Sequence, residues 1–370
     1  MEITDLEAVP VAADVKPLDE PGGLAPYVSS TGRVTTAERL LVRLETDTGV
    51  TGWGEILLEL SPAATVAVVE EEIAPRVVGR EVWEIEAVMD EFFYYYVDVD
   101  SLLGAVEMAM WDALGKHYDA PLHQLLGGKC ADEVPVAYCV GILDPEQSRE
   151  HARYALNEGY DVLKTKGGRD WETDVERLRA IHDEVDGQLE LRVDANQGWS
   201  FEDAVRVGAT LEDAGVYLQY LEQPTRIETY GTYERLRSRL RQPICVNDDT
   251  YFDHNLFNMV REDAVDVGVV DVAPSGIRGV ERMAGVAADA GVSLAHHCGF
   301  DLGVKTAAML HTVASTPAIG LASDTVYYAW DDHVVESPFT VSEGALSVPD
   351  GPGLGVTVDE SRVADLRIDV

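Results

Sequence analysis

The amino-acid sequence predicts an α/β protein in which a closed barrel of parallel strands carries the functional site. Three observations predict this class. Between about residue 134 and residue 321, short β-branched runs alternate with amphipathic helical segments. Polar residues able to do chemistry close these runs at nearly even spacing. The chain has 370 residues, more than the roughly 250 that a βα barrel needs, so a second domain is expected.

The spacing of the polar residues indicates one βα unit per step. Successive steps are 28, 28, 25, 24, 26 and 27 residues, and a strand, a helix and two loops together need roughly this length. The residues of the series are Lys166, Asp194, Glu222, Asn247, Asp271, His297 and Asp324. In a closed parallel barrel the strand ends meet at one rim, so we expect these side chains around a single pocket.

The first 120 residues predict an antiparallel sheet followed by helices. The expected strands are 6–10, 40–46 and 51–55, with a Pro-, Gly- and Ser-rich loop over 16–35 and a tight turn at 47–49. Helical periodicity covers 60–120, most clearly over 63–73 and 105–116, and Pro121 begins a new segment.

The barrel segment predicts strands with the uniform hydrophobicity of a parallel sheet. The expected strands are 134–140, 189–193, 267–270 and 292–295, and the expected helices are 170–184, 200–214, 277–290 and 303–314. From about residue 330 the pattern returns to strand and loop, so we expect the tail to rejoin the first domain.

Composition restricts the partners and the setting. The net charge of −39, from 67 acidic and 28 basic residues, would repel nucleic acid and anionic membranes, and we expect neither as a partner. Only six basic residues are lysine while the apolar share stays at 46%, which is typical of a halophilic protein that remains soluble in concentrated salt. No apolar run approaches 18 residues, so nothing is expected to span a bilayer.

The cysteines indicate a reduced, cytoplasmic protein. Cys130, Cys139, Cys245 and Cys298 form no closely spaced pair, and no charged-then-apolar leader precedes the first strand. The chain also lacks a glycine-rich phosphate loop, a serine nucleophile elbow and zinc-ligand spacing. Nucleotide chemistry is therefore not expected.

Asp194 and Glu222 end adjacent predicted strands and predict a site for a hard divalent cation, with Mg²⁺ as the first choice. The next strand end should supply the third ligand. Both Asn247 and Asp248 stand there, because the register of Pro243-Ile-Cys-Val-Asn-Asp-Asp can slip by one residue. Spacing alone does not decide between Asn247 and Asp248, so both remain candidates at this point.

Two groups of side chains are candidates for proton transfer. Lys164 and Lys166 point to the same side of a strand, and two nearby ammonium groups would lower a lysine pKa toward the range of a general base. Asp271 and His297 close two later strands, where the carboxylate would fix the tautomer of the imidazole. His296 competes with His297; the spacing favours His297, and we expect the other histidine to be structural.

Asp324 stands one unit after His297 and has two interpretations. It could hydrogen-bond the substrate or orient the histidine. It could equally cap the N-terminus of a helix before Tyr327.

These residues resemble the enolase superfamily, in its mandelate racemase and muconate lactonizing branch, over essentially the whole chain. The motifs are Leu163-Lys-Thr-Lys-Gly-Gly168, Val193-Asp-Ala-Asn196 and Leu221-Glu-Gln-Pro224. The resemblance implies a modified (β/α)7β TIM-type barrel over 126–329. It also implies an N-terminal α+β capping domain over 1–125, joined by the tail 330–370, and Mg²⁺ as cofactor.

Within that branch the chain looks most similar to acid sugar dehydratases of the glucarate dehydratase type. The matching points are Gly167-Gly168, Asn247 as a metal ligand, Asp271, and an ungapped run from His297 to Asp324-Thr325. Cycloisomerases and dipeptide epimerases of the branch carry a lysine where Asp271 stands. The resemblance therefore favours a lyase over an isomerase.

The implied reaction begins with removal of the proton α to the carboxylate of a small-molecule substrate. By resemblance, Lys166 or His297 removes the proton, Lys164 holds a carboxylate oxygen, and protonated His297 helps to expel the β-hydroxyl as water. The product would be a 2-keto-3-deoxy acid. A racemase or a muconate-type cycloisomerase remains the alternative activity, and a catalytically silent binding module is the alternative class.

Substrate recognition is expected from the loop over 16–35 and from residues 51–55, which should cover the pocket. Tyr27 and Arg33 are the candidates in the loop, and Asn196 is a further candidate beside the first metal ligand. We also expect an even-numbered homo-oligomer, the ordinary result of symmetric assembly.

Overall fold

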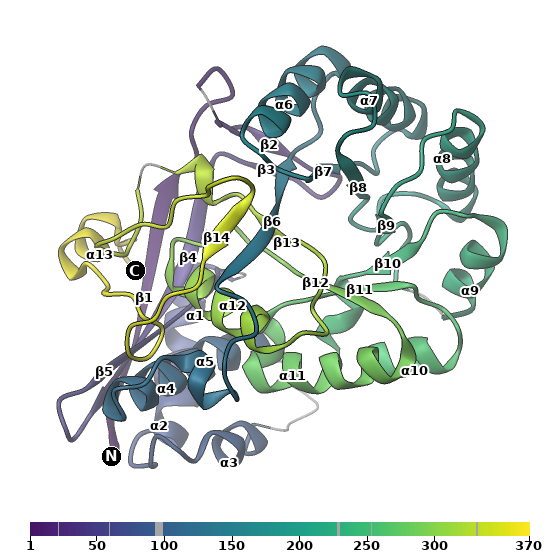
Figure 1. Cartoon of the computed structure of the whole chain (residues 1–370). Coiled ribbons are helices and arrows are strands. Elements are labelled where there is room, and N and C mark those ends of the chain that lie inside the picture. Colours follow the sequence, from purple (N-terminus) through teal and green to yellow (C-terminus); the bar gives the residue numbers. More distant parts are fainter. Residues whose placement is uncertain (21, 59, 93–98, 228–229, 253, 331) are drawn as a thin grey trace.

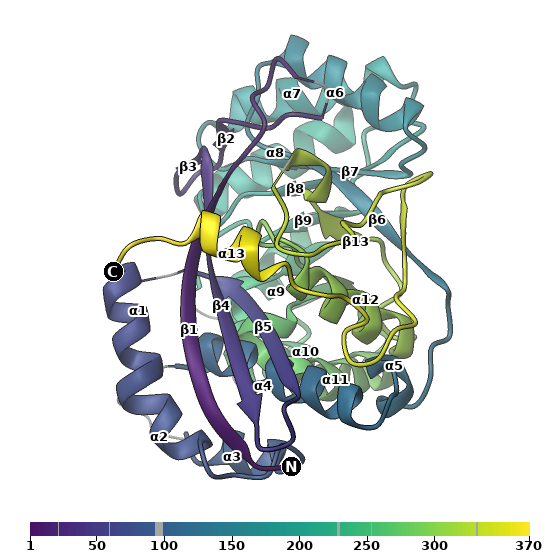
Figure 2. The same cartoon turned by 90° about the vertical axis from the view of Figure 1, so that its left-hand side faces the viewer.

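The computed structural model describes residues 1–370 apart from 21, 59, 93–98, 228–229, 253 and 331, and it confirms the predicted fold class (Figure 1). A barrel of parallel strands lies beside a smaller domain built on an antiparallel sheet. From the side, this sheet and its helices run along one flank of the barrel (Figure 2). Within the described parts of the chain, no helix has the length and apolar character that crossing a membrane requires.

The smaller domain, called the cap below, is built on the sheet β1 (Ile3–Asp14), β4 (Thr36–Thr46) and β5 (Thr51–Leu57), in the order β1-β4-β5. Helix α4 (Asp100–His117) packs against β5. Two glycines of β5 allow this close approach. A Cβ on Gly52 or Gly54 would lie 2.0 or 1.9 Å from a backbone carbonyl oxygen of α4.

The remaining cap elements are short. Residues Tyr27–Val28 (β2) and Arg33–Val34 (β3) form a small antiparallel hairpin. The other helical segments are α1 (Pro62–Val68), the π-helical turn η1 (Val69–Ile73), α2 (Ala74–Val77), α3 (Ile85–Asp90) and α5 (Leu122–Leu125).

In the described chain, eight parallel strands form the barrel. Each strand from β6 to β11 pairs with the next one, so the series ends at β12, and β13 returns to pair with β6. Between β12 and β13 the N–H of Leu321 donates to the carbonyl of Leu294 at 3.0 Å, so the ring is nearly closed. The strands are β6 (Glu133–Val140), β7 (Val162–Lys166), β8 (Glu190–Asp194), β9 (Tyr220–Glu222), β10 (Ile244–Val246), β11 (Val267–Val270), β12 (Ser293–His296) and β13 (Ser323–Thr325).

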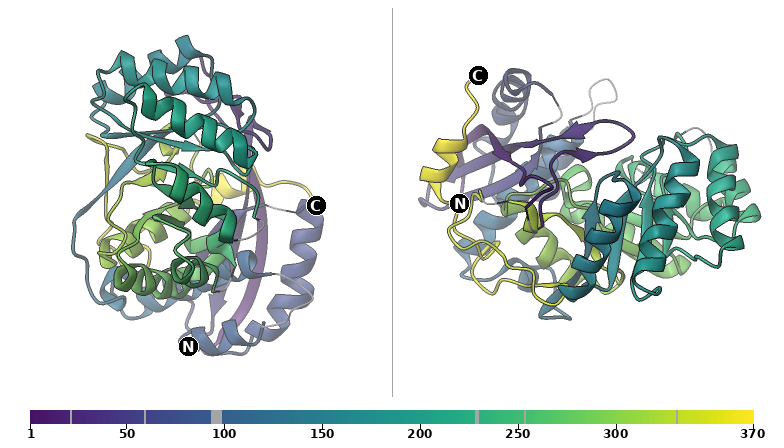
Figure 3. Two further views of the ribbon diagram at one scale, coloured as in Figure 1. Left: turned by 90° about the vertical axis from the view of Figure 1, so that its right-hand side faces the viewer. Right: turned by 90° about the horizontal axis from the view of Figure 1, so that it is seen from above.

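Helices surround the barrel on its outside (Figure 1), and the turned views show them side by side on its outer face (Figure 3). Several begin at acceptors that the sequence places there: the side chains of Asp144, Asp170 and Ser200 each cap the N-terminus of the following helix. The helices are α6 (Pro145–Asn157), α7 (Trp171–Glu184), α8 (Phe201–Asp213), α9 (Tyr230–Arg239), α10 (Asn255–Arg261), α11 (Val272–Ala290) and α12 (Val304–Ser315), with the 3₁₀ turns η2 (Asp248–Tyr251) and η3 (Tyr327–Ala329).

The C-terminal segment contacts both domains. Strand β14 (Ala345–Ser347) pairs antiparallel with β6 of the barrel. Helix α13 (Glu360–Leu366) packs on β1 of the cap, and Val11 and Arg367 form an antiparallel bridge. The tail therefore ties the two domains together along one side (Figure 2).

The cap docks on the barrel mainly through α4 and α11. At the crossing point, a Cβ built on Gly104 of α4 would lie 1.6 Å from the carbonyl oxygen of Ala273 at the start of α11. Glu107, one turn further along α4, accepts the backbone N–H of Arg278 at 3.0 Å. The interface is thus a close backbone contact that a larger residue cannot enter.

We predict that Gly104→Ala lowers the free energy of unfolding by about 1–3 kcal/mol, because the new methyl group forces α4 away from α11. Gly285→Ala is the matched control, since it lies in α11 with open space around its Cβ position. The control should be neutral or stabilising by up to about 1 kcal/mol. Denaturant unfolding of both variants measures the difference, and equal stabilities would contradict the close contact.

Candidate active site

The strand ends place the predicted residues at one rim of the barrel. Lys166 ends β7, Asp194 ends β8 and Glu222 ends β9, and the register aligns Lys166 with Asp194 and Asp194 with Glu222. Asn247 and Asp271 directly follow β10 and β11. The even spacing therefore reflects a real convergence in space.

Lys164 lies at the centre of the acidic residues. Its fully buried ammonium group is 2.7 Å from Glu222 Oε2, 2.6 Å from Asp324 Oδ2 and 3.7 Å from Asp194 Oδ2. Burial alone would lower the pKa of Lys164, but the carboxylates, led by Asp324, raise it well above its ordinary value. The expected lowering of the pKa by a lysine pair is therefore wrong for Lys164, because carboxylates outnumber the neighbouring ammonium group.

Lys166 contacts a single acidic residue within the described part of the chain and lies nearer to solvent. Its Nζ is 2.5 Å from Asp194 Oδ2, and 12% of its side chain is exposed compared with 3% for Lys164. Asp194 Oδ1 also accepts the backbone N–H of Asn196 at 2.8 Å. Lys166 is thus the lysine that a bound molecule could reach.

The buried carboxylates are electrostatically crowded. Burial and the nearby Asp194 raise the pKa of Glu222 to about 8, although Lys164 acts against this. For Asp194, burial alone would raise the pKa, but Lys166 and Lys164 lower it to about 2. Such crowding of acidic oxygens is what an added cation would relieve.

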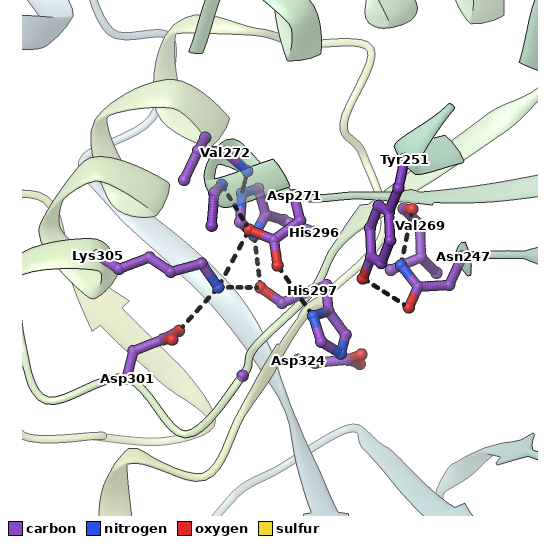
Figure 4. A network of polar contacts seen from close by, with 12 residues as sticks. Asn247, Tyr251, Val269, Asp271, Val272, His296, His297, Asp301, Lys305 and Asp324 are labelled. Atoms are coloured by element: carbon purple, nitrogen blue, oxygen red, sulfur yellow. Dashed lines mark hydrogen bonds and ion pairs between the residues drawn. The ribbon is translucent and has the colours of Figure 1, made fainter. Parts of the chain in front are cut away.

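Asn247 and Asp248 differ in what their side chains face. Asn247 is buried, its Nδ2 donates to Val269 O at 3.1 Å, and its Oδ1 accepts the Tyr251 hydroxyl at 3.0 Å (Figure 4). Asp248 is partly exposed and receives a hydrogen bond from Gln197 Nε2 at 2.5 Å. Burial and Asp194 raise the pKa of Asp248, while Lys166 and His297 lower it, so its carboxylate faces the rim residues.

Three acidic residues, Asp194, Glu222 and Asp248, thus surround the rim with hard oxygen donors suited to Mg²⁺. No three His, Cys, Asp or Glu side chains among the described residues are already gathered as a metal cluster, and the ammonium groups of Lys164 and Lys166 contact the carboxylates. Asn196 Oδ1 is buried and accepts no hydrogen bond within the described chain. The donor set fits a cation whose binding would separate these ion pairs.

Asp271 and His297 form a hydrogen-bonded dyad, with 3.0 Å between Asp271 Oδ2 and His297 Nδ1 (Figure 4). Although burial would raise the pKa of Asp271, Lys305 and then His297 lower it, so the group stays a carboxylate. His297 Nδ1 is thereby occupied, and its side chain is 21% exposed. Nε2 is the ring nitrogen left for proton transfer.

His296 is the structural histidine of the pair. It is fully buried, its Nε2 accepts the Val272 N–H at 3.1 Å, and its Nδ1 lies 2.8 Å from the His297 carbonyl oxygen. Burial lowers the pKa of His296 to about 4, so the ring is neutral near pH 7. The choice of His297 made from spacing agrees with this geometry.

Asp324 lies within β13 and contacts two buried cations. Its Oδ2 is 2.6 Å from Lys164 Nζ, and its Oδ1 is 3.2 Å from Arg192 Nη1. Burial alone would raise the pKa of Asp324, but Lys164 and Arg192 hold it below its ordinary value. The alternative of a helix cap is wrong, because η3 begins after Val326 and has no side-chain cap.

Of the two loop candidates, the structure brings Tyr27 to the site and leaves Arg33 exposed. Burial raises the pKa of Tyr27; Cys139, Asp194 and Asp324 add to this rise, while Lys164 opposes it. Ser30, in the same hairpin, donates to the carbonyl oxygen of Ala195 at 2.9 Å. The cap hairpin therefore lies over the rim.

Sequence reasoning missed several residues near the site. Phe300 has a left-handed backbone, with φ of 65°, and its ring meets Tyr27 edge-on at 5.0 Å and Trp330 at 5.6 Å. Lys305 of α12 is 3.1 Å from Asp271 Oδ1 and is fully buried. Neither residue follows the spacing of the strand ends. A lysine within an apolar helix of a chain with six lysines was the one available signal for Lys305.

Two family models match the chain. The model "Mandelate racemase / muconate lactonizing enzyme, N-terminal domain" covers residues 12–127, and "Enolase C-terminal domain-like" covers residues 147–362. The chain therefore belongs to the enolase superfamily, in the mandelate racemase and muconate lactonizing enzyme group. Members of this superfamily are enzymes that generally bind Mg²⁺.

Individual relatives carry different activities. The L-Ala-D/L-Glu epimerase of Bacillus subtilis is 27% identical, covering 90% of this chain and 92% of that protein. The arabinonate dehydratase of Saccharolobus solfataricus is also 27% identical, covering 87% and 88%. Overall identity therefore does not choose between isomerase and dehydratase.

Solved structures agree with the fold over nearly the whole chain. An enolase from Streptomyces coelicolor, described as a putative sugar isomerase, is 32% identical with a TM-score of 0.87 and covers 99% of this chain and 96% of its own. An enolase from Thermobispora bispora, complexed with magnesium and formate, is 29% identical with a TM-score of 0.85 and covers 99% and 92%.

The two histidines should behave differently when each is replaced by glutamine. His296→Gln disturbs two buried hydrogen bonds and should cost about 1–3 kcal/mol of unfolding free energy, whereas His297→Gln should cost less than about 1 kcal/mol. The native protein should lose stability as pH falls from 6.5 toward 4, the interval through which burial lowers the pKa of His296. The difference in unfolding free energy between the native protein and His296→Gln should therefore become smaller as the pH falls. Unfolding at several pH values measures this, and a larger cost at His297 would contradict the assignment.

Proposed function

We propose that this protein is a Mg²⁺-dependent dehydratase that removes the proton α to the carboxylate of an acid sugar and then eliminates the β-hydroxyl as water. One observation carries the proposal: proton-transfer groups stand on two sides of the buried carboxylates. Lys166 ends β7, and the Asp271–His297 dyad stands at the ends of β11 and β12. Between β7 and β12 lie two strands on one side of the ring and four on the other.

We propose Asp194, Glu222 and Asp248 as the residues that would hold Mg²⁺. Asp248, the register alternative, replaces Asn247 in this set because both polar groups of the Asn247 side chain already bond to Val269 and Tyr251. The bound ion would supply positive charge that stabilises the negative charge developing on the substrate carboxylate. The magnesium complex of the Thermobispora bispora relative supports this cofactor.

The chain's own groups have distinct roles in this proposal. Lys164, whose pKa is raised, stays charged and holds a carboxylate oxygen of the substrate. Lys166, the more exposed lysine, accepts the α-proton on one face. His297 Nε2 delivers a proton to the departing hydroxyl, while Asp271 keeps Nδ1 protonated and stabilises the imidazolium. The α-proton and the proton that leaves with the hydroxyl as water therefore have a named acceptor and a named donor, and the enol so formed becomes the 2-keto acid by proton exchange with solvent.

The substrate class rests on the site and on the relatives. Asp271, a carboxylate, stands where a second lysine would indicate a cycloisomerase or a dipeptide epimerase. An arabinonate dehydratase and a putative sugar isomerase among the relatives support a sugar acid. Tyr27 and Phe300 would bound the pocket on the cap side, with Asn196 beside it.

Racemisation is the second candidate. Two bases on different sides of the substrate could remove the α-proton and return it to the opposite face, and an epimerase is among the relatives. The distinction is whether water leaves after proton removal. The excess of acidic residues leads us to propose that the enzyme works in the cytoplasm at high salt. We also propose an even-numbered homo-oligomer, the ordinary result of symmetric assembly.

The third metal ligand can be tested by calorimetric Mg²⁺ titration. Asp248→Asn should weaken Mg²⁺ binding at least about tenfold, because a charged oxygen donor is lost. Asn247→Ala should change the affinity by less than about threefold, although it removes two hydrogen bonds. A stronger effect at Asn247 would reverse the assignment.

The reaction can be tested by screening aldonic and aldaric acids with Mg²⁺ at high salt and detecting the 2-keto product. We expect at least one acid sugar to yield this product. His297→Asn should reduce dehydration by about 10²–10⁴-fold and leave Mg²⁺ affinity unchanged. If α-deuterium exchange proceeds while no acid sugar loses water, the dehydratase proposal fails. Full turnover by His297→Asn would remove that residue from its role.

A further inference from the structure

A buried series of ion pairs, called the ion-pair series below, connects the cap to His297. From the cap it runs through Glu55 of β5, Arg39 of β4, Asp301 after β12, Lys305 of α12 and Asp271 after β11. The side chains before His297 are at most 5% exposed. Figure 4 shows the inner part, where Lys305 reaches between Asp301 and Asp271 and the His297 ring lies beyond Asp271.

The contacts of Lys305 leave its ammonium group fully engaged by the barrel. Nζ is 3.1 Å from Asp271 Oδ1, 3.2 Å from Asp301 Oδ2 and 3.5 Å from the carbonyl oxygen of His297. Its side chain is 1% exposed, so it cannot touch a substrate. Any influence on the reaction must pass through Asp271 and His297.

The cap holds the outer end of the ion-pair series. Arg39 Nη2 is 2.8 Å from Asp301 Oδ1, its Nη1 donates to Gly299 O at 2.5 Å, and its Nε is 3.2 Å from Glu55 Oε1. Glu55 also accepts the backbone N–H groups of Leu302 at 2.6 Å and Lys305 at 2.9 Å. A cap strand thus fixes the start of the helix that carries Lys305.

The ion-pair series carries a net charge next to His297. Glu55, Asp301 and Asp271 are acidic, whereas Arg39 and Lys305 are basic. With the three carboxylates ionised, one negative charge is in excess, and a proton on His297 balances it. Among the described residues, the charged or titratable groups that adjoin His297 or act on it include Asp248, Asp271, His296, Lys305, Asp324 and its sequence neighbour Cys298.

We propose that Lys305 is a positioning residue of the Asp271–His297 dyad: its ammonium group holds Asp271 as a carboxylate directed at His297 and limits how tightly the dyad binds a proton. Arg39 and Glu55 of the cap, acting through Asp301, hold Lys305 in that position. The inference rests on the proposed function only in giving His297 a proton to transfer.

The direction in which each substitution shifts the proton affinity of the Asp271–His297 dyad follows from charge alone. Removing the positive charge of Lys305 raises the proton affinity of the dyad, because one cation no longer opposes the imidazolium. Removing the negative charge of Asp301 lowers that affinity. A general loosening of the structure would not give opposite shifts, so the pair of variants separates an electrostatic role from a merely structural one.

The test is an NMR titration of the His297 ring in the full-length protein, with labelled histidine and the signal identified by its loss in His297→Asn. Lys305→Met should move the titration midpoint of His297 upward by about one to two pH units, as expected for a unit charge several ångströms away in a protein interior. Asp301→Asn should move it downward by a smaller amount. Lys305→Arg, which keeps the charge, should stay within about half a unit of the native midpoint.

Lys129→Met is the matched control, because this lysine pairs with Asp132 and Asp350 at the surface. It should leave the midpoint unchanged. A native midpoint in folded Lys305→Met, or shifts of the same sign in Lys305→Met and Asp301→Asn, overturns the proposal. If Lys305→Met does not fold, Asp301→Asn alone provides the test, and an unchanged or raised His297 midpoint in that variant overturns the proposal.

The titration needs no substrate, so its outcome is independent of the proposed function. If the expected shifts occur and no acid sugar reacts, Lys305 affects the proton affinity of the dyad as proposed, but the proposed reaction is wrong. If an acid sugar reacts and no shift occurs, the reaction stands and the role of Lys305 fails. Where turnover is found, the pH profile of kcat should shift in the same direction as each midpoint.

Discussion

The burial of several carboxylates at one rim is the constraint on which the rest of this structure depends. Isolated carboxylates in such a place would lose their charge, because transfer from water is costly. Here Lys164 lies among Asp194, Glu222 and Asp324, and Arg192 supports Asp324 from within the barrel. The raised pKa of Glu222, which burial and Asp194 cause, indicates that the lysines compensate incompletely. That remaining deficit makes the rim suitable for a divalent cation.

The cap supplies side chains that contact the barrel rim and its supporting ion pairs. Its hairpin places Tyr27 against Phe300 over the rim, and its central sheet sends Arg39 and Glu55 into the barrel beside α12. The same strand β5 that supplies Glu55 is held against α4 by Gly52 and Gly54. The docking of the two domains and the support of the Asp271–His297 dyad therefore share one set of elements.

The sequence predicted the barrel and most of the rim because both follow from local repetition. A strand, a helix and their loops repeat with a period near 26 residues, and each strand end sets a side chain at the same level. Lys166, Asp194, Glu222, Asp271 and His297 were all found in this way. The period could not separate Asn247 from Asp248, since a shift of one residue lies within the variation of the loops.

The sequence by itself thus determined the fold class, the family and the series of polar residues at the strand ends. The tertiary structure decided which side chains face one another. It placed Lys305 behind Asp271, engaged Asn247 with Val269 and Tyr251, left Arg33 exposed, and reversed the expected pKa shift of Lys164. These outcomes depend on ion pairs and burial between segments distant in sequence, which local periodicity does not encode.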